Sequence, residues 1–228
     1  LLEDAGFVFD EARAASGNVP MVVGIQRAEG PLYFNSLVAL DHAGAVIATY
    51  NKHHLVPFGE YIPFGDVMAH FGISAFAAKA GNGYSAGPGP QVLDLGRGGK
   101  VLPLICYEAV FPQDLRTGKR PDWMVQITND SWFGTLAGPW QHLAQAQLRA
   151  IEQGLPLLRA ANTGVTAVID ARGRVLQSLG LDVDGWLDAD VPPALPPTLY
   201  ARTGDLPVTM LLLGCILSLL VHRRPRVC

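Results

Sequence analysis

The feature that most constrains this chain is an apolar run near its C-terminus. From Leu206 to Val221 the sequence reads LPVTMLLLGCILSLLV, 16 residues without a charge. At about 1.5 Å per residue, a helix over this run is roughly 24 Å long, somewhat less than the roughly 30 Å hydrocarbon core of a bilayer. Two interpretations are open at this point: a transmembrane helix, or a helix buried in the core of a globular domain.

The residues that follow the run favour the membrane. His222, Arg223, Arg224 and Arg226 come directly after it, and positively charged residues beside a membrane helix stay on the cytoplasmic side. We therefore expect a transmembrane helix over residues 206–222 and a cytoplasmic tail over residues 223–228. On this orientation the rest of the chain lies on the opposite side of the membrane.

Composition and charge exclude several classes of protein. The 228 residues are 49% hydrophobic and 16% charged, with 25 Gly and 17 Pro, which is typical of one folded domain and not of a coiled coil or a disordered chain. Lys and Arg number 17 against 20 Asp and Glu, and there is no long basic run, so we expect no nucleic-acid partner. The chain begins at Leu1 without a signal peptide. Either it is a fragment of a longer protein whose upstream part held a signal or membrane segments, or the orientation above is wrong.

Short apolar runs and amphipathic segments alternate before the tail. Helices are expected over residues 1–16 and 139–153, the second with Leu143, Ala146, Ala150 and Ile151 facing inward. Strands are expected over residues 20–26, 34–40, 46–50, 101–106, 123–128, 157–160, 165–169 and 175–179. The first strand has the continuous apolar pattern of a strand covered on both faces. The mixture predicts an α/β layered domain with a mixed sheet over residues 1–191, followed by a Pro-rich linker over residues 192–205.

Four polar residues lie where predicted strands run into irregular loops, the usual location of active sites: Lys52, Glu60, Cys106 and Glu108. A thiol must be ionised to attack a carbonyl carbon, and a nearby ammonium stabilises first the thiolate and then the oxyanion. A carboxylate would move the proton. Glu108 is two residues from the thiol, so we expect it to orient Lys52 or a loop. Each residue also has an ordinary interpretation, as a solvated loop residue or a buried core cysteine.

Other kinds of site have weaker support. Cys106, Cys215 and Cys228 are too few and too scattered for a disulfide framework, so Cys106 is expected to be a free thiol. A Cys106–His142 dyad is conceivable, although its spacing does not single out that histidine. His53 and His54 are expected to point apart along an extended chain, and the spacing of His and Cys predicts no metal site. No phosphate-binding loop is present in the sequence, so no cofactor is expected.

Longer motifs carry a specific resemblance. They are YNKHHLVPFGEYIP at residues 50–63, ICYEAVFP at 105–112, TNDSWFG at 128–134, QH at 141–142, RAIE at 149–152 and RAANTG at 159–164. In this order, along about two thirds of the chain, they resemble the apolipoprotein N-acyltransferases of bacteria, a membrane branch of the nitrilase superfamily. The resemblance implies a nitrilase-like α-β-β-α sandwich followed by a C-terminal transmembrane helix.

The resemblance also implies site residues. Lys52 matches the family's catalytic lysine, Cys106 its nucleophile and Glu60 a further essential glutamate. Tyr107 and Glu108 match residues that the family needs, with the Tyr107 N–H completing the oxyanion hole. The general-base glutamate is expected upstream of Leu1, and neither Glu3 nor Glu11 is assigned that role. The 228 residues alone are therefore expected to be inactive.

The implied reaction transfers an acyl chain from a phospholipid to the N-terminal amino group of a diacylglyceryl-cysteine apolipoprotein, through a thioester. The implied location is the bacterial inner membrane, with the catalytic domain in the periplasm and the C-terminus in the cytoplasm. Phe58, Tyr61, Ile62 and Phe64 are either a lipid-facing cover or ordinary packing under a loop. Two other functions remain open: a soluble amidase or nitrilase-type hydrolase of the same superfamily, and a non-catalytic membrane-tethered relic of the fold.

Overall fold

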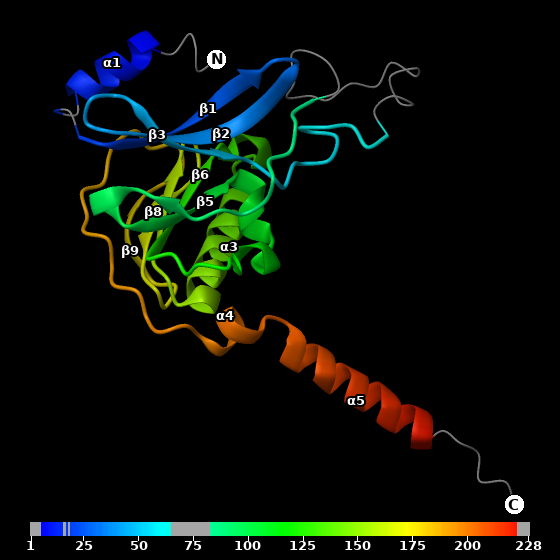
Figure 1. Cartoon of the computed structure of the whole chain (residues 1–228). Helices are drawn as coiled ribbons and strands as arrows, with labels where there is room; N and C mark the ends of the chain where they lie inside the picture. The colour runs from blue at the N-terminus through cyan, green and yellow to red at the C-terminus, as the bar shows by residue number, and fades with distance from the viewer. Residues whose placement is uncertain (1–5, 16, 18, 65–82, 223–228) are drawn as a thin grey trace, which may run out of the picture.

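The computed structural model describes residues 6–15, 17, 19–64 and 83–222. Two β-sheets pack face to face, with a helix on the outer side of each (Figure 1). The predicted α-β-β-α sandwich is therefore confirmed. Helix α1 (Gly6–Ala15) covers the smaller sheet, and residues 1–5 and 16 of the helix predicted over 1–16 lie outside the described residues.

The smaller sheet is a three-stranded meander of β1 (Met21–Glu29), β2 (Leu32–Leu40) and β3 (Val46–Asn51), all antiparallel. The β2–β3 hairpin was predicted and is confirmed, with the Asp41 carboxylate accepting from the N–H groups of Ala43 and Ala45 in the turn. The expectation that the first strand is covered on both faces is wrong. Among the described residues β1 lies at the edge of the sheet, and its side chains are half-buried or exposed because the layers above and below it do not cover them fully.

The larger sheet has the order β4-β5-β6-β7-β8-β9. Its strands are β4 (Leu93–Asp94), β5 (Lys100–Ile105), β6 (Trp123–Thr128), β7 (Leu157–Ala161), β8 (Thr166–Ile169) and β9 (Val175–Leu179). β5, β6 and β7 are parallel and the other pairs are antiparallel, so the predicted mixed sheet is confirmed. The apolar runs of β5 and β6 are buried because both faces of this sheet are covered.

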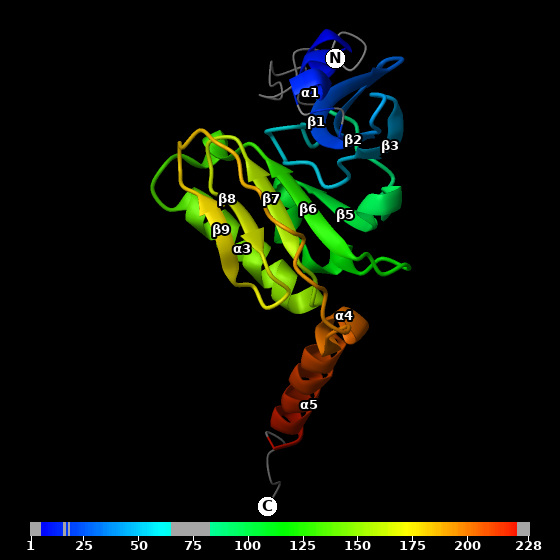
Figure 2. The ribbon, with the colours of Figure 1, turned by 90° about the vertical axis from the view of Figure 1, so that its left-hand side faces the viewer.

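Helix α3 (Gly138–Gln153) packs on the face of the larger sheet that is turned away from the smaller one (Figure 2). Pro139 stands at its start and Gly154 ends it in a left-handed conformation. Leu143, Ala146 and Ala150 are buried as predicted. Ile151 is 47% exposed, so that prediction is wrong: it lies at the flank of the apolar stripe, against Gly173.

Two apolar clusters hold the layers together. One lies between α3 and the larger sheet and includes Leu102, Met124 and Leu143. The other lies between the two sheets, where Leu37 and Tyr50 of the smaller sheet meet Val101 and Ile105 of the larger one. The second cluster fixes how the end of β3 faces the end of β5, and these two ends carry the candidate site residues.

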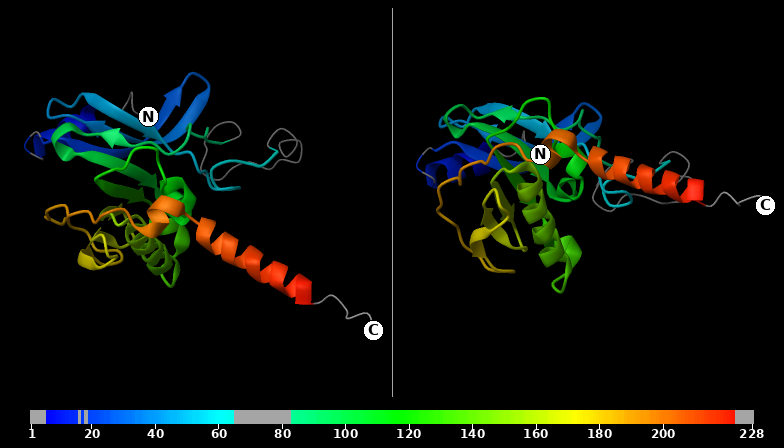
Figure 3. Two further views of the ribbon diagram at one scale, coloured as in Figure 1. Left: turned by 60° about the horizontal axis from the view of Figure 1, so that its bottom comes forward. Right: turned by 90° about the horizontal axis from the view of Figure 1, so that it is seen from below.

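The C-terminal part leaves the sandwich. Residues 180–198 contain no helix or strand and lead to α4 (Leu199–Thr203) and α5 (Leu206–His222). Helix α5 extends away from the sandwich in each view (Figure 3), and none of its residues is buried. The interpretation of this run as a buried core helix is therefore wrong. Across the described ranges, no helix combines the length and the apolar character that crossing a membrane requires.

Candidate active site

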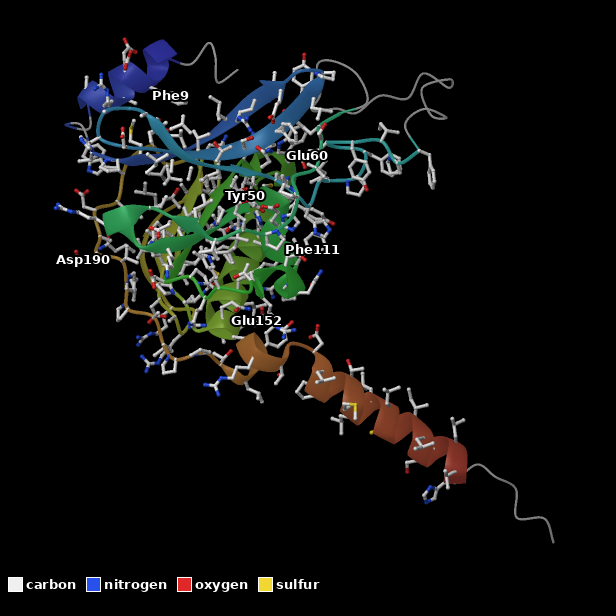
Figure 4. The ribbon with its side chains drawn as sticks, viewed as in Figure 1. Phe9, Tyr50, Glu60, Phe111, Glu152 and Asp190 are labelled. Carbon is white, nitrogen blue, oxygen red and sulfur yellow. The ribbon has the colours of Figure 1, made fainter. Side chains whose placement is uncertain are left out.

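The site residues come from both sheets, at the ends of β3 and β5. Lys52 follows β3 and Cys106 follows β5. Tyr50, Glu60 and Phe111 lie at the same end of the two sheets (Figure 4). The site is therefore built at the edge where the two layers meet.

Lys52 is held in a buried ion pair. Its side chain is 1% exposed, and its Nζ donates to Glu60 Oε2 at 2.6 Å. Glu60 also accepts from Asn35 Nδ2 at 3.0 Å and from the Val56 N–H at 2.9 Å. A buried pair is stable only when its remaining polar atoms are hydrogen-bonded. These contacts satisfy the carboxylate of the pair, and the fixed carboxylate holds the ammonium in one place.

Cys106 stands at the turn from β5 into a short 3₁₀ segment, Cys106–Val110. It is a free, half-buried thiol, as predicted. Its backbone is left-handed, with φ of 50°. Such a conformation is costly for a non-glycine residue, and residues of this kind cluster at active sites and ligand clamps. The main-chain carbonyl of Cys106 lies 3.2 Å from Gln126 Nε2 and 3.0 Å from His142 Nε2.

Glu108 joins the two parts of the site. Its Oε1 accepts from the N–H groups of His53 and His54 at 2.8 and 3.3 Å, and from the Tyr50 hydroxyl at 2.8 Å. Its Oε2 accepts from the Ile105 N–H at 2.7 Å. Of the two expected roles, Glu108 orients the loop after Lys52, while Lys52 itself is held by Glu60. Burial, followed by the Glu108 charge, raises the pKa of Tyr50 far above its ordinary value, so its hydroxyl stays a donor.

A cavity of about 590 Å³ opens beside these groups. Tyr107 lines this cavity. Its ring packs edge to face on the ring of Phe111, with 4.9 Å between the two ring centroids. The wall is aromatic and apolar over much of its area; it is formed by His53, His54, Leu55, Pro57, Tyr61, Tyr84, Ala86, Tyr107 and Phe111. Of the predicted apolar cover, Tyr61 lines the cavity, Ile62 is buried, and Phe58 and Phe64 are exposed.

The expectation that His53 and His54 point apart is wrong. The chain bends at His54, so both rings reach the same oxygen, Asp114 Oδ2, at 3.2 and 2.9 Å. Burial lowers the pKa of His53, but Glu108 and Asp114 outweigh burial and raise it above its ordinary value. The ligand atoms of the three residues lie within 4.8 Å of one another, so this group could hold a metal ion.

His142 is part of the site in a different way from the dyad considered above. Its Nδ1 lies 2.9 Å from Asp130 Oδ1 and its Nε2 lies at the Cys106 carbonyl, which leaves neither ring nitrogen for the thiol. Asn35, Gln126, Asp130 and Arg159 were not predicted as site residues. The last two stand in the TNDSWFG and RAANTG motifs, which was the one signal available in the sequence.

Comparison with known proteins adds three kinds of likeness. The carbon-nitrogen hydrolase family profile matches residues 11–195. The chain is 48% identical over 193 residues to a protein of Rhodopseudomonas palustris named apolipoprotein N-acyltransferase, covering 84% of this chain and 36% of that protein. It is 50% identical over 192 residues to a protein of the same name from Bradyrhizobium diazoefficiens, covering 84% and 35%. The chain thus spans about a third of the length of these relatives.

Solved structures share the fold at low identity. An amidase from Nesterenkonia sp. is 19% identical, with a TM-score of 0.57 over 92% of this chain and 74% of that one. A CN-hydrolase superfamily protein from Xanthomonas campestris is 19% identical, with a TM-score of 0.52 over 73% of this chain and 60% of that one. At this identity the likeness concerns the fold alone.

Proposed function

The chain belongs to the carbon-nitrogen hydrolase family, and we propose that it forms part of an apolipoprotein N-acyltransferase in which Cys106 is the nucleophile. The observation that carries this proposal is that the Glu108 carboxylate accepts hydrogen bonds from both sides of the site. One comes from the loop that follows the buried Lys52, and the other from the strand end that leads into the left-handed turn at Cys106. The relatives at 48% and 50% identity support the choice of reaction within the family.

The proposed reaction has two steps. The Cys106 thiolate attacks the carbonyl carbon of a phospholipid ester; the C–S bond forms, the C–O bond breaks, and a lysophospholipid leaves. The free amino group of a diacylglyceryl-cysteine apolipoprotein then attacks the thioester carbonyl; the C–N bond forms, the C–S bond breaks, and the proton lost by the amine restores the Cys106 thiol. The Lys52 ammonium and the Tyr107 N–H stabilise the oxyanion in both steps.

Glu60 and Glu108 act in this proposal as positioning residues. Glu60 holds the ammonium of Lys52, and Glu108 holds the loop that follows it. Neither carboxylate has a contact with the Cys106 thiol among the described residues. We therefore propose that the general base is a glutamate upstream of Leu1. For this reason we expect no catalytic turnover from the 228 residues by themselves.

Membrane attachment is the second part of the proposal. The large apolar side chains of α5 are each 53–67% exposed, and none of its residues is buried. Burying one Leu or Ile side chain contributes about 1.5–3 kcal/mol, which favours insertion of this helix into lipid. At about 1.5 Å per residue the 17 residues of α5 are shorter than a hydrocarbon core of roughly 30 Å, so a crossing by this helix requires local thinning of the bilayer. We propose that α5 anchors the protein in the bacterial inner membrane in this way, with residues 1–191 on the periplasmic side, residues 192–205 as linker and residues 223–228 in the cytoplasm.

The test follows the thioester. The full-length gene product, reconstituted in phospholipid vesicles, is expected to carry an acyl group on Cys106 that peptide mass spectrometry detects and neutral hydroxylamine removes. Lys52→Met is expected to abolish acylation, because the oxyanion loses its nearest charge. Cys215→Ala is the matched control, since this exposed cysteine lies on α5, outside the site. Acylation that persists in Cys106→Ala, or full turnover in Lys52→Met, would contradict the proposal.

The two other functions make different predictions in the same preparation. A soluble-type amidase releases ammonia from small amides and forms no thioester with phospholipid. A non-catalytic relic binds the lipoprotein and forms neither product. The apolar surface of α5 does not favour the first, and the ordered Lys52–Glu60 pair does not favour the second.

A further inference from the structure

Arg159 is the centre of a buried polar network beneath the nucleophile. Its side chain is fully buried and all three guanidinium nitrogens are used. Nε donates to the Val165 carbonyl at 3.1 Å, Nη1 to Gln126 Oε1 at 2.6 Å, and Nη2 to Asp130 Oδ2. Gln126 and Arg159 are register partners on the adjacent parallel strands β6 and β7, so their closeness follows from the sheet itself.

Two chains of polar contacts, called arms below, lead from Arg159 to the main-chain oxygen of Cys106. One runs through Gln126, and the other runs through Asp130 and His142. A guanidinium only donates, so Gln126 must turn its oxygen to Arg159 and its Nε2 to the Cys106 carbonyl, 3.2 Å away. On the other arm, His142 Nδ1 lies 2.9 Å from Asp130 Oδ1 and 3.3 Å from Arg159 Nη2, and His142 Nε2 lies 3.0 Å from both the Cys106 carbonyl and Gln126 Nε2. Only a ring with a hydrogen on both nitrogens donates to Asp130 and to the carbonyl at once, and the inference requires that form. Both arms therefore end at the nucleophile's own backbone.

The residues packed around Asp130 leave room for its carboxylate and supply it with a further hydrogen bond. A Cβ at position 164 would overlap the Asp130 carboxylate, so only glycine leaves room for it there. Thr128 Oγ1 donates to Asp130 Oδ1 at 2.9 Å. The motifs TNDSWFG and RAANTG, which the reaction steps leave without a role, thus supply the acid, its hydroxyl donor, the arginine and the glycine of one network.

The charges of the network are coupled to the thiol. Burial lowers the pKa of the Arg159 guanidinium, while the Asp130 carboxylate and the charge of Cys106 act against that shift. Burial also raises the pKa of Asp130, but the His142 hydrogen bond and the Arg159 charge outweigh it and hold it below its ordinary value. The ion pair is therefore retained inside the protein, and its cation is close enough to interact with Cys106.

We propose that Arg159, Asp130, His142 and Gln126 are positioning residues that hold the Cys106 carbonyl and so set the direction in which the thiol meets the acyl carbon. Cys106 has the left-handed backbone that such a hold must maintain. The inference rests on the proposed function for the role of Cys106 as nucleophile and for the identity of the acyl donor; the network and its contacts with the Cys106 carbonyl do not depend on it.

A pair of substitutions at His142 separates positioning from a purely structural role. When glutamine replaces a histidine, its side-chain amide nitrogen lies close to the former position of Nε2. When asparagine replaces it, the amide nitrogen lies close to the former position of Nδ1. His142→Gln therefore keeps a donor for the Cys106 carbonyl and loses the Asp130 contact, whereas His142→Asn does the reverse. We expect His142→Asn to lower kcat for thioester formation by about a hundredfold with KM unchanged, and His142→Gln to recover most of that loss. A structural role predicts the opposite order, because only Asn keeps the buried carboxylate paired.

Gln126→Glu gives an independent measurement. Glutamate keeps the contact with Arg159 but has no hydrogen to donate to the Cys106 carbonyl. We expect a folded protein with kcat lowered by at least about tenfold. Gln153→Glu is the matched control, since Gln153 is a buried glutamine at the far end of α3, and it is expected to keep the native rate.

The same preparations are treated with iodoacetamide, and alkylation of Cys106 is followed by peptide mass spectrometry. Equal rates of thioester formation and of alkylation in the two His142 variants would overturn the positioning role and leave the proposed function standing. Absence of a thioester in the native protein, with Cys106 alkylated more slowly in His142→Asn than in His142→Gln, would overturn the proposed function and support the positioning role.

Discussion

At the scale of single residues, two buried ion pairs lie close to Cys106 in this protein. Lys52 with Glu60, and Arg159 with Asp130, are buried pairs whose remaining oxygens accept from Asn35, Val56, Thr128 or His142. Replacing a buried ion pair by apolar residues is often neutral or stabilising, so stability alone does not explain such pairs. Their position beside Cys106 agrees with a role in fixing the geometry of the site.

Asp130→Asn tests the buried pair through pH. The pKa of Asp130 is held below its ordinary value of 3.8, so the ionised carboxylate stabilises the fold above that pH, and this contribution is lost as the pH falls through the lowered pKa. We expect Asp130→Asn to lower the free energy of unfolding at pH 7 by about 3 kcal/mol. The difference from the native chain should shrink at pH 3 and below. Urea denaturation of the 228-residue chain at several pH values measures it.

Asp190→Asn is the control, because Asp190, labelled in Figure 4, is exposed. It should leave the unfolding midpoint unchanged at every pH. An Asp130→Asn deficit that is equally large at pH 7 and pH 2 would show that the lost charge is not its cause.

The residues of the site could be found in the sequence more readily than their partners. Lys52, Glu60, Cys106 and Glu108 stand at predicted strand ends and were singled out for that reason. Asn35 and Arg159 could not be assigned, because the atoms they contact belong to residues 25 and 29 positions away. The divergent placement of His53 and His54 was wrong for the same reason: a bend, and not an extended chain, decides where the two rings point.

At the scale of elements, periodicity predicted where most elements lie but not always how deeply they are buried. The α3 stripe of Leu143, Ala146 and Ala150 is buried, whereas Ile151 is exposed at its flank. β1 has an apolar run and still lies at a sheet edge. Periodicity reports one face of an element, and the depth of burial depends on which neighbour covers that face.

Two leucines of α3 give a matched prediction. Leu143 is 8% exposed and packs in the cluster between α3 and the larger sheet, while Leu148 is 49% exposed on the same helix. Leu143→Ala is expected to lower the free energy of unfolding by about 2–4 kcal/mol, because it removes buried area and leaves a cavity. Leu148→Ala is expected to change it by less than about 0.5 kcal/mol. Chemical denaturation measures both, and equal effects would show that α3 does not pack as described.

At the scale of the whole molecule, the sandwich and α5 are separate in their contacts. The sandwich buries its apolar residues between layers, and α5 leaves all of its large apolar side chains exposed. An apolar surface of this extent on a protein marks a contact with another protein or a membrane. The proposal of a membrane anchor accounts for it.

The anchor is tested by charging α5. Leu213 and Leu217 are 56% and 63% exposed and lie on one face of the helix. The double variant Leu213→Lys, Leu217→Lys is expected to abolish flotation of the chain with phospholipid vesicles, since each lysine near the centre of a membrane helix costs about 2.5–3.5 kcal/mol. The urea midpoint of the sandwich should not change. Leu199→Lys on α4 is the control and should float like the native chain; unchanged flotation of the double variant would contradict the anchor.

The sequence by itself determined the kind of layers, the positions of most strands, the helix over residues 138–153 and the residues able to do thiol chemistry. These depend on local patterns: the alternation of apolar residues, glycine at turns and polar residues at strand ends. The tertiary structure alone decided that Glu60 pairs with Lys52, that Glu108 bridges two loops, and that Arg159 reaches the Cys106 carbonyl through two arms. These contacts join residues from different strands and loops. A hydrogen bond of about 3 Å between such groups depends on how the two sheets pack and on strand register, which no local pattern contains.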